Sequence, residues 1–131
     1  MMLAPLTARV LIADDDAVIL RLLEVNFSLE GYEVVTASRG EEAIERASEG
    51  RFDLIVLDVM MPGMDGWEVA SRLKEEEVTA SIPVVFLSAR TQEQDKERGM
   101  RLGVAAYVTK PFDPEELLGL AQRLIADQPS R

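Results

Sequence analysis

Short, mostly apolar runs alternate along the chain with longer stretches in which apolar residues recur every three or four positions. The runs predict strands buried on both faces, and the longer stretches predict amphipathic helices. The predicted strands are residues 9–13, 32–36, 54–58, 83–88 and 105–109. The predicted helices are residues 17–30, 38–49, 65 onward, 91–102 and 113–126. The second run is the most polar, so we place it nearer an edge of the sheet.

Signals for helix ends support these boundaries. At four helix starts, Ser, Thr or Asp is followed three residues later by Glu or Gln, the spacing of a capping box: Ser38, Asp65, Thr91 and Asp113. Asp16 is the best candidate to cap the first helix, and Pro114 suits the first position of the last one. Gly31, Gly50 and Gly103 are expected to end the helices that precede them.

Five strands that alternate with five helices predict an α/β fold with a doubly wound, parallel sheet and right-handed crossovers. The chain of 131 residues is long enough for one domain with a sizeable core. We expect a single domain over residues 1–131, with its core at about residues 8–126. Residues 127–131 are polar and contain proline, so they are expected to fray or to begin a linker.

Composition excludes several kinds of function. The chain has 24 acidic and 14 basic residues, and its net charge of −10 opposes direct binding to nucleic acid. It contains no Cys and no His, which removes disulfides, thiolate metal sites and a histidine base. No apolar run approaches the roughly 20 residues of a membrane helix, and the first residues lack the pattern of a signal peptide. We therefore expect a cytoplasmic protein that does not enter a membrane.

Polar side chains with useful chemistry follow four of the predicted strands. Asp58 ends the third strand, at the edge where open α/β sheets place their ligands, whereas a lone Asp there would most often cap a turn. Asp14 and Asp15 follow the first strand, Ser88 ends the fourth and Lys110 follows the fifth. Each has a plain structural explanation when taken alone, but parallel strands bring all their carboxyl ends to one side. Together they predict a single site.

Clustered carboxylates repel one another unless a cation neutralises them. A set of oxygen ligands suits Mg²⁺ and also accommodates Mn²⁺. The hydroxyl group of Ser88 and the ammonium group of Lys110 can both reach phosphoryl oxygens. A carboxylate nucleophile, a divalent cation and two electrophilic groups match phosphoryl transfer, where charge neutralisation does most of the work.

Four segments resemble the receiver domain of two-component response regulators, including chemotaxis regulators: residues 10–16, 58–66, 84–89 and 107–112. The resemblance covers about residues 8–126 and implies a flavodoxin-like sheet with strand order 2-1-3-4-5. It also implies a signalling switch, not an enzyme in its own right. The expected phosphoryl donor is a phosphohistidine on a sensor histidine kinase or on a histidine phosphotransfer protein.

The resemblance assigns roles to individual residues. Asp58 is the phosphoryl acceptor, and Asp15, Asp58 and the backbone carbonyl of Met60 bind Mg²⁺, while Asp14 holds a coordinated water. Ser88 and Lys110 contact phosphoryl oxygens.

The resemblance further assigns Tyr107 as the aromatic switch that turns inward as Ser88 moves. The signal would then reach the face formed by the fourth helix, the fifth strand and the fifth helix. It also makes Lys110-Pro111 a candidate cis peptide bond, although cis is the less common form of such bonds.

One departure concerns assembly. Winged-helix transcription factors of this family usually carry an acidic pair before the switch aromatic, and this chain has Ala105 and Ala106 there. We therefore expect a monomer that dimerises at most weakly on phosphorylation, and this departure weighs against membership of that class.

Other functions remain as alternatives. A Mg²⁺-dependent phosphohydrolase of the haloacid dehalogenase type would need Asp in place of Met60. A nucleotide or flavin binder would need a glycine-rich phosphate loop after a strand, and none of the predicted strands is followed by such a loop. A receiver that signals without phosphorylation would not need the complete site. A receiver fragment of a longer DNA-binding regulator also fits the chain.

Overall fold

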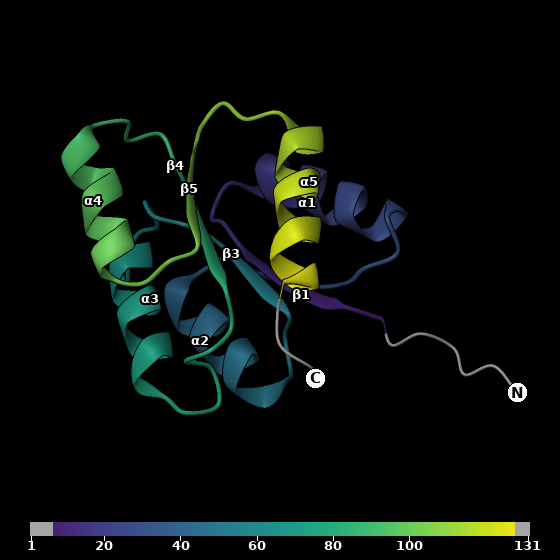
Figure 1. The fold of residues 1–131 in the computed structure, drawn as a ribbon, viewed down its shortest axis with the longest axis horizontal. Helices are drawn as coiled ribbons and strands as arrows, with labels where there is room; N and C mark the ends of the chain where they lie inside the picture. Colours follow the sequence, from purple (N-terminus) through teal and green to yellow (C-terminus); the bar gives the residue numbers. More distant parts are fainter. Residues whose placement is uncertain (1–6, 128–131) are drawn as a thin grey trace, which may run out of the picture.

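Figure 1 shows a computed structural model of the protein, which describes residues 7–127. Strands and helices alternate throughout: β1 (Arg9–Ala13), α1 (Ala17–Leu29), β2 (Glu33–Ala37), α2 (Gly40–Glu49), β3 (Leu54–Asp58), α3 (Gly66–Glu75), β4 (Val84–Ser88), α4 (Glu93–Arg101), β5 (Ala106–Thr109) and α5 (Pro114–Ala126). The five strands form one parallel sheet in the order β2-β1-β3-β4-β5. The predicted fold class and strand order are confirmed.

Helices cover both faces of the sheet. Helices α1 and α5 lie on one face, and α2, α3 and α4 lie on the other (Figure 1). Strands β3 and β4 occupy the middle of the covered sheet, and every residue in both strands is buried. Strand β2 lies at an edge and is only partly buried, as its more polar sequence predicted.

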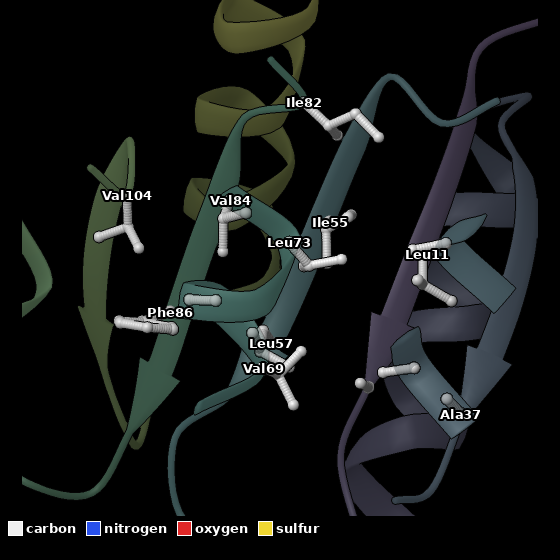
Figure 2. Close-up of a cluster of buried hydrophobic side chains, with 14 of the residues drawn as sticks. Leu11, Ala37, Ile55, Leu57, Val69, Leu73, Ile82, Val84, Phe86 and Val104 are labelled. Atoms are coloured by element: carbon white, nitrogen blue, oxygen red, sulfur yellow. The ribbon is translucent and has the colours of Figure 1, made fainter. Parts of the chain in front are cut away.

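Two apolar cores hold these layers together. Successive residues of a strand point to opposite faces, so Ile55 and Leu57 belong to one core while Leu54 and Val56 belong to the other. Figure 2 shows the first core, in which side chains of β3 and β4 pack against Val69 and Leu73 of α3 and their neighbours. Each fully buried aliphatic side chain contributes roughly 1.5–3 kcal/mol. This packing fixes the carboxyl ends of the strands in space.

The predicted helix starts are correct at three of the five helices. Asp16, Asp65 and Asp113 each accept a hydrogen bond from a backbone N–H of the first turn. The capping boxes expected at Ser38 and Thr91 are wrong. The cap positions lie one residue later, at Arg39 and Gln92, and neither side chain forms a capping bond. Near Ser38, the carboxylate of Glu42 accepts a 2.9 Å hydrogen bond from the Ser38 backbone N–H.

Some predicted boundaries move by one residue. Gly31 has a φ of +93° and ends α1 in the left-handed conformation, as predicted. The Tyr32 N–H then bonds to the Phe27 carbonyl, so Tyr32 belongs to the helix end and β2 begins at Glu33. Gly50 ends α2 in an extended conformation instead of a left-handed one. Strands β4 and β5 each begin one residue later than predicted.

No helix within residues 7–127 is long and apolar enough to cross a membrane. The prediction that residues 127–131 fray or begin a linker falls outside the described residues, apart from Asp127, which follows α5. The Lys110-Pro111 peptide bond is cis, in agreement with the expectation from the resemblance.

Candidate functional site

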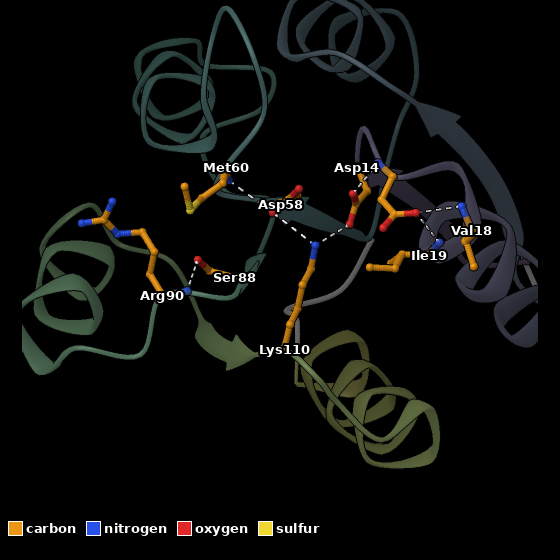
Figure 3. Close-up of polar contacts among 9 residues, drawn as sticks. Asp14, Val18, Ile19, Asp58, Met60, Ser88, Arg90 and Lys110 are labelled. Atoms are coloured by element: carbon orange, nitrogen blue, oxygen red, sulfur yellow. Dashed lines mark hydrogen bonds and ion pairs between the residues drawn. The ribbon is translucent and has the colours of Figure 1, made fainter.

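The carboxyl edge of the sheet gathers the predicted site residues from four strands. Asp14 follows β1, Asp58 is the last residue of β3, Ser88 is the last residue of β4 and Lys110 follows β5. Figure 3 shows Asp14, Asp58 and Lys110 pointing toward one another, with Ser88 on the neighbouring strand. Each reaches this edge because the parallel strands pair in register, with Asp58 opposite Leu87 and Ser88 opposite Thr109.

A close backbone contact places the loop that follows Asp58. The Gly66 N–H donates a 2.8 Å hydrogen bond to the Val59 carbonyl. A Cβ atom at residue 66 would lie 2.5 Å from the Asp58 carbonyl oxygen, so only glycine allows α3 to begin this close to β3. The loop from β3 therefore turns sharply beside Asp58 and keeps that carboxylate at the edge.

Three carboxylates form an acidic cluster. One oxygen each from Asp14, Asp15 and Asp58 lie within 4.8 Å of one another. Asp14 and Asp58 are buried, whereas Asp15 is exposed. Asp14 is held in place because its Oδ1 atom accepts a 2.8 Å hydrogen bond from the Asp16 N–H. The arrangement presents several oxygen ligands at the surface end of a buried strand, which is the donor set of a hard divalent cation.

Lys110 is the positive charge of this cluster. Its Nζ atom lies 3.0 Å from Asp14 Oδ2 and 3.4 Å from Asp58 Oδ1. Burial opposes the charged ammonium, but the hydrogen bond to Asp14 and the charges of Asp58 and Asp14 outweigh it and raise the pKa of Lys110. The lysine therefore stays charged at neutral pH. One ammonium faces three carboxylates, so the site keeps an excess of negative charge.

Asp58 has a strongly perturbed pKa. Burial at the end of β3 and the nearby charge of Asp14 raise the pKa of Asp58 to about 6. Lys110 and the Met60 N–H, which donates a 3.2 Å hydrogen bond to Asp58 Oδ1, partly offset this effect. A cation at the cluster would favour the ionised carboxylate. The residues present thus fit Mg²⁺ by donor type and by the electrostatic need for positive charge.

Ser88 and Tyr107 are linked through the backbone of Arg90. Ser88 is fully buried, and its Oγ atom accepts a 3.0 Å hydrogen bond from the Arg90 N–H. The Tyr107 hydroxyl donates a 2.9 Å hydrogen bond to the Arg90 carbonyl. The half-buried Tyr107 ring packs edge-on to Phe86, with ring centroids 6.2 Å apart. The two residues predicted to act together therefore share one connecting residue.

The ion pair between Arg90 and Asp95 was not predicted from the sequence. The Arg90 guanidinium lies 3.1 Å from the buried carboxylate of Asp95, which belongs to the first turn of α4. An acidic residue in a first helical turn is already favoured by the helix dipole, so its presence gave no signal of this partner. Arg90 consequently connects the end of β4 with both β5 and α4.

Comparison with known proteins gives one family. Residues 10–122 match the response regulator receiver domain family. The alkaline phosphatase synthesis transcriptional regulatory protein PhoP of Bacillus subtilis is 44% identical over 109 residues, which are 83% of this chain and 45% of that protein. The chain thus spans about half the length of the curated relatives it matches. Several of these relatives are named transcriptional regulators, which weighs mildly against the expectation of no direct binding to nucleic acid and against the class argument from Ala105 and Ala106.

Solved structures agree with this result. The chemotaxis protein CheY4 of Vibrio cholerae has a TM-score of 0.86 at 35% identity, over 91% of this chain and 99% of that one. The receiver domain of a sensor histidine kinase from Pseudomonas aeruginosa PAO1 has a TM-score of 0.85 at 27% identity, over 93% of this chain and all of that one. That kinase receiver domain has a magnesium ion coordinated in its active site cleft.

Proposed function

This chain belongs to the response regulator receiver domain family, whose members act in phosphorylation-dependent signalling, and from that premise we propose that Asp58 is its phosphoryl acceptor. The observation that carries the proposal is the cluster of Asp14, Asp15 and Asp58 around Lys110 at the carboxyl edge of the sheet. Asp58 is the best candidate for the nucleophile because it ends the central strand β3, between Asp14 after β1 and Ser88 at the end of β4, and its Oδ1 atom lies 3.4 Å from Lys110 Nζ. The relatives of this chain are response regulators with receiver domains, not enzymes with substrates of their own.

The chemistry follows from the charges of the site. Receiver domains of response regulators take their phosphoryl group from histidine kinases. An Asp58 carboxylate oxygen attacks the phosphorus of the donor phosphohistidine, and the bond between phosphorus and the imidazole nitrogen breaks. The imidazole keeps the electron pair and takes up a proton, which leaves an acyl phosphate on Asp58. Lys110 and the hydroxyl group of Ser88 then contact the phosphoryl oxygens.

Asp14, Asp15, Asp58 and the backbone carbonyl of Met60 would hold Mg²⁺, and Mn²⁺ suits the same oxygen donors. When bound, the cation neutralises charge on the carboxylates and on the incoming phosphoryl group. Lys110, which follows the edge strand β5, already neutralises part of that charge, and the hydrogen bond from the Asp16 N–H keeps Asp14 oriented. We propose a cytoplasmic reaction, because the phosphohistidine donor, a sensor histidine kinase or a histidine phosphotransfer protein, draws its phosphoryl group from ATP.

The signal would leave through Arg90. If Ser88 moves toward the phosphoryl group, its bond to the Arg90 N–H couples that movement to the Tyr107 hydroxyl and to the face of α4, β5 and α5. We further propose that DNA binding, as in the relatives named transcriptional regulators, belongs to a part of a longer protein. The net charge of −10 on this chain opposes a direct contact with nucleic acid.

Acetyl phosphate labelling, followed by intact mass and peptide mapping, tests the assignment. Wild-type protein with Mg²⁺ should gain one phosphoryl group at Asp58, and EDTA should suppress the gain. Asp58→Asn should not be labelled. The matched control Asp113→Asn also removes one acidic group, at the N-cap of α5, where Asn can cap the helix as well. It should be labelled like wild type. Equal labelling of Asp58→Asn, or labelling that EDTA does not reduce, would contradict the proposal.

A further inference from the structure

Met60 places an exposed thioether beside Asp58. Residue 60 is 53% exposed, whereas its neighbour Met61 is 4% exposed and lies in the core. The Met60 N–H donates to Asp58 Oδ1, which fixes the start of this side chain two residues from the proposed nucleophile. Figure 3 shows the Met60 side chain on the same side of Asp58 as Ser88 and Arg90. Oxidation chemistry at this sulfur would therefore act directly on the surroundings of Asp58.

Methionine is the main sulfur-based target for an oxidant in this chain. The sequence has six Met and no Cys, so no thiol competes for peroxide. Exposure decides which thioethers react, and it separates Met60 from Met61. Met100, in the last turn of α4, is 58% exposed and provides an oxidisable residue on another element. The structure therefore contains both a candidate residue and an internal comparison.

We infer that Met60 is a reversible oxidation site that controls how long the phosphoryl group stays on Asp58, an inference that rests on the proposed function. The Met60 sulfur attacks one oxygen of hydrogen peroxide and the O–O bond breaks. The proton on the attacked oxygen passes to the departing hydroxide, which leaves as water. The sulfur loses two electrons and becomes a sulfoxide, and the peroxide is reduced. A methionine sulfoxide reductase reverses the change.

The sulfoxide changes the chemistry next to the acyl phosphate. A thioether is a weak hydrogen-bond acceptor, so Met60 gives an attacking water little orientation. A sulfoxide oxygen is a strong acceptor and can hold such a water near the phosphorus. The Arg90 guanidinium is paired with Asp95 at 3.1 Å, and this ion pair holds its charged end toward α4. Oxidation therefore shortens the lifetime of the phosphoryl group.

Limited treatment with hydrogen peroxide and peptide mapping test the first step. Met60 and Met100 should convert to sulfoxide well before Met61. Conversion of Met61 at the same rate as Met60 would overturn the inference, because exposure would not select the residue. The treated protein should keep its melting temperature. A fall in melting temperature that accompanies faster phosphoryl loss would attribute that loss to unfolding, and would also overturn the inference.

The second step is tested on protein phosphorylated by acetyl phosphate and then separated from the donor. Intact mass follows the decay in oxidised and untreated samples, and the measured quantity is the ratio of the two rates. In the wild type, the decay rate of the oxidised sample divided by that of the untreated sample should be severalfold above one. It should return to one after treatment with sulfoxide reductase. In Met60→Leu, which carries every other oxidised methionine, the ratio should stay at one.

Met60→Gln, which places a carbonyl oxygen near the same position, should decay faster than Met60→Leu without any oxidant. An equal rise in the ratio for wild type and Met60→Leu, or no rise in either, would overturn the inference and leave Asp58 as the acceptor. Absence of any labelling at Asp58 would instead refute the proposed function and this inference together.

Discussion

Replacing Asp58 by Asn should stabilise the metal-free domain at neutral pH. Asp58 is 3% exposed, and its carboxylate shares the site with Asp14. Burial and that neighbouring charge disfavour the ionised form and raise its pKa to about 6. Asn keeps the shape and can still accept the Met60 N–H, but it carries no charge. The native state of the variant is therefore relieved of an unfavourable ionisation.

The size of the effect follows from the pKa. A change from 3.8 in the unfolded chain to about 6 in the folded one is roughly 2 pK units, or about 3 kcal/mol as an upper bound. Asp58 also attracts Lys110 at 3.4 Å, and Asn loses that attraction. We therefore expect a gain of about 1–3 kcal/mol in the free energy of unfolding, or roughly 5–10 °C in melting temperature for a domain of this size.

The pH dependence has a definite sign. Because the folded state binds the Asp58 proton more tightly than the unfolded state, protonation stabilises the fold. The destabilisation by Asp58 is complete above the folded pKa of about 6 and disappears as the pH falls toward 3.8. The advantage of Asn should therefore be large at neutral pH and absent near the unfolded pKa.

Urea unfolding in EDTA at these two pH values measures the difference, with Asp113→Asn as a control for the loss of one negative charge. Mg²⁺ should then raise the stability of wild type and have little effect on Asp58→Asn. An equal gain for Asp58→Asn at both pH values, or no gain at neutral pH, would refute the electrostatic argument.

Three further predictions follow from the contacts around the site. Lys110→Ala should leave Mg²⁺ binding intact or tighter in calorimetry, because the ammonium competes with a cation for the same carboxylates. In this variant beryllofluoride should no longer shift the conformation. Much weaker Mg²⁺ binding would contradict the prediction. Arg90→Ala should lower the free energy of unfolding by about 1–3 kcal/mol, because Asp95 is buried and loses its partner, and adding Asp95→Asn should recover part of the loss. Beryllofluoride should leave the domain monomeric in sedimentation at micromolar concentration, because Ala105 and Ala106 cannot form ion pairs between protomers. A dimer that is abolished by charge reversal at Arg101 or Arg123 would contradict this prediction.

The sequence predicts the sheet well because burial on both faces leaves a plain mark on β1, β3 and β4, whose residues are almost all apolar. It also predicts that Asp58, Ser88 and Lys110 meet, because parallel strands share one carboxyl edge. Capping at Ser38 and Thr91 was mispredicted for a different reason. A capping box is recognised from residue types and spacing alone, whereas the cap position of both helices lies one residue later, at Arg39 and Gln92, with no side-chain capping bond. At α2 the Ser38 N–H bonds to Glu42 instead of to the residue that the spacing predicts.

Contacts made by long side chains were beyond the sequence pattern. Lys110 could have pointed to solvent, and only the fold shows that its Nζ atom lies between Asp14 and Asp58. Likewise, the pairing of Arg90 with Asp95 depends on how the loop after β4 turns into α4. Such contacts depend on rotamers and loop geometry, which no periodicity records. The fold alone, without its side chains, does not determine these contacts.

The position of Arg90 explains how a small movement at Ser88 could be transmitted without a large change in the core. The backbone N–H and carbonyl of Arg90 are both engaged, one by Ser88 and the other by Tyr107. A shift of the Ser88 hydroxyl that carries the Arg90 peptide with it must therefore lengthen or redirect the bond from Tyr107. The ion pair between the Arg90 guanidinium and Asp95 would carry the same shift to α4. Because strands β3 and β4 are buried in two cores, we expect the connecting loop, rather than the sheet, to be the element with two arrangements.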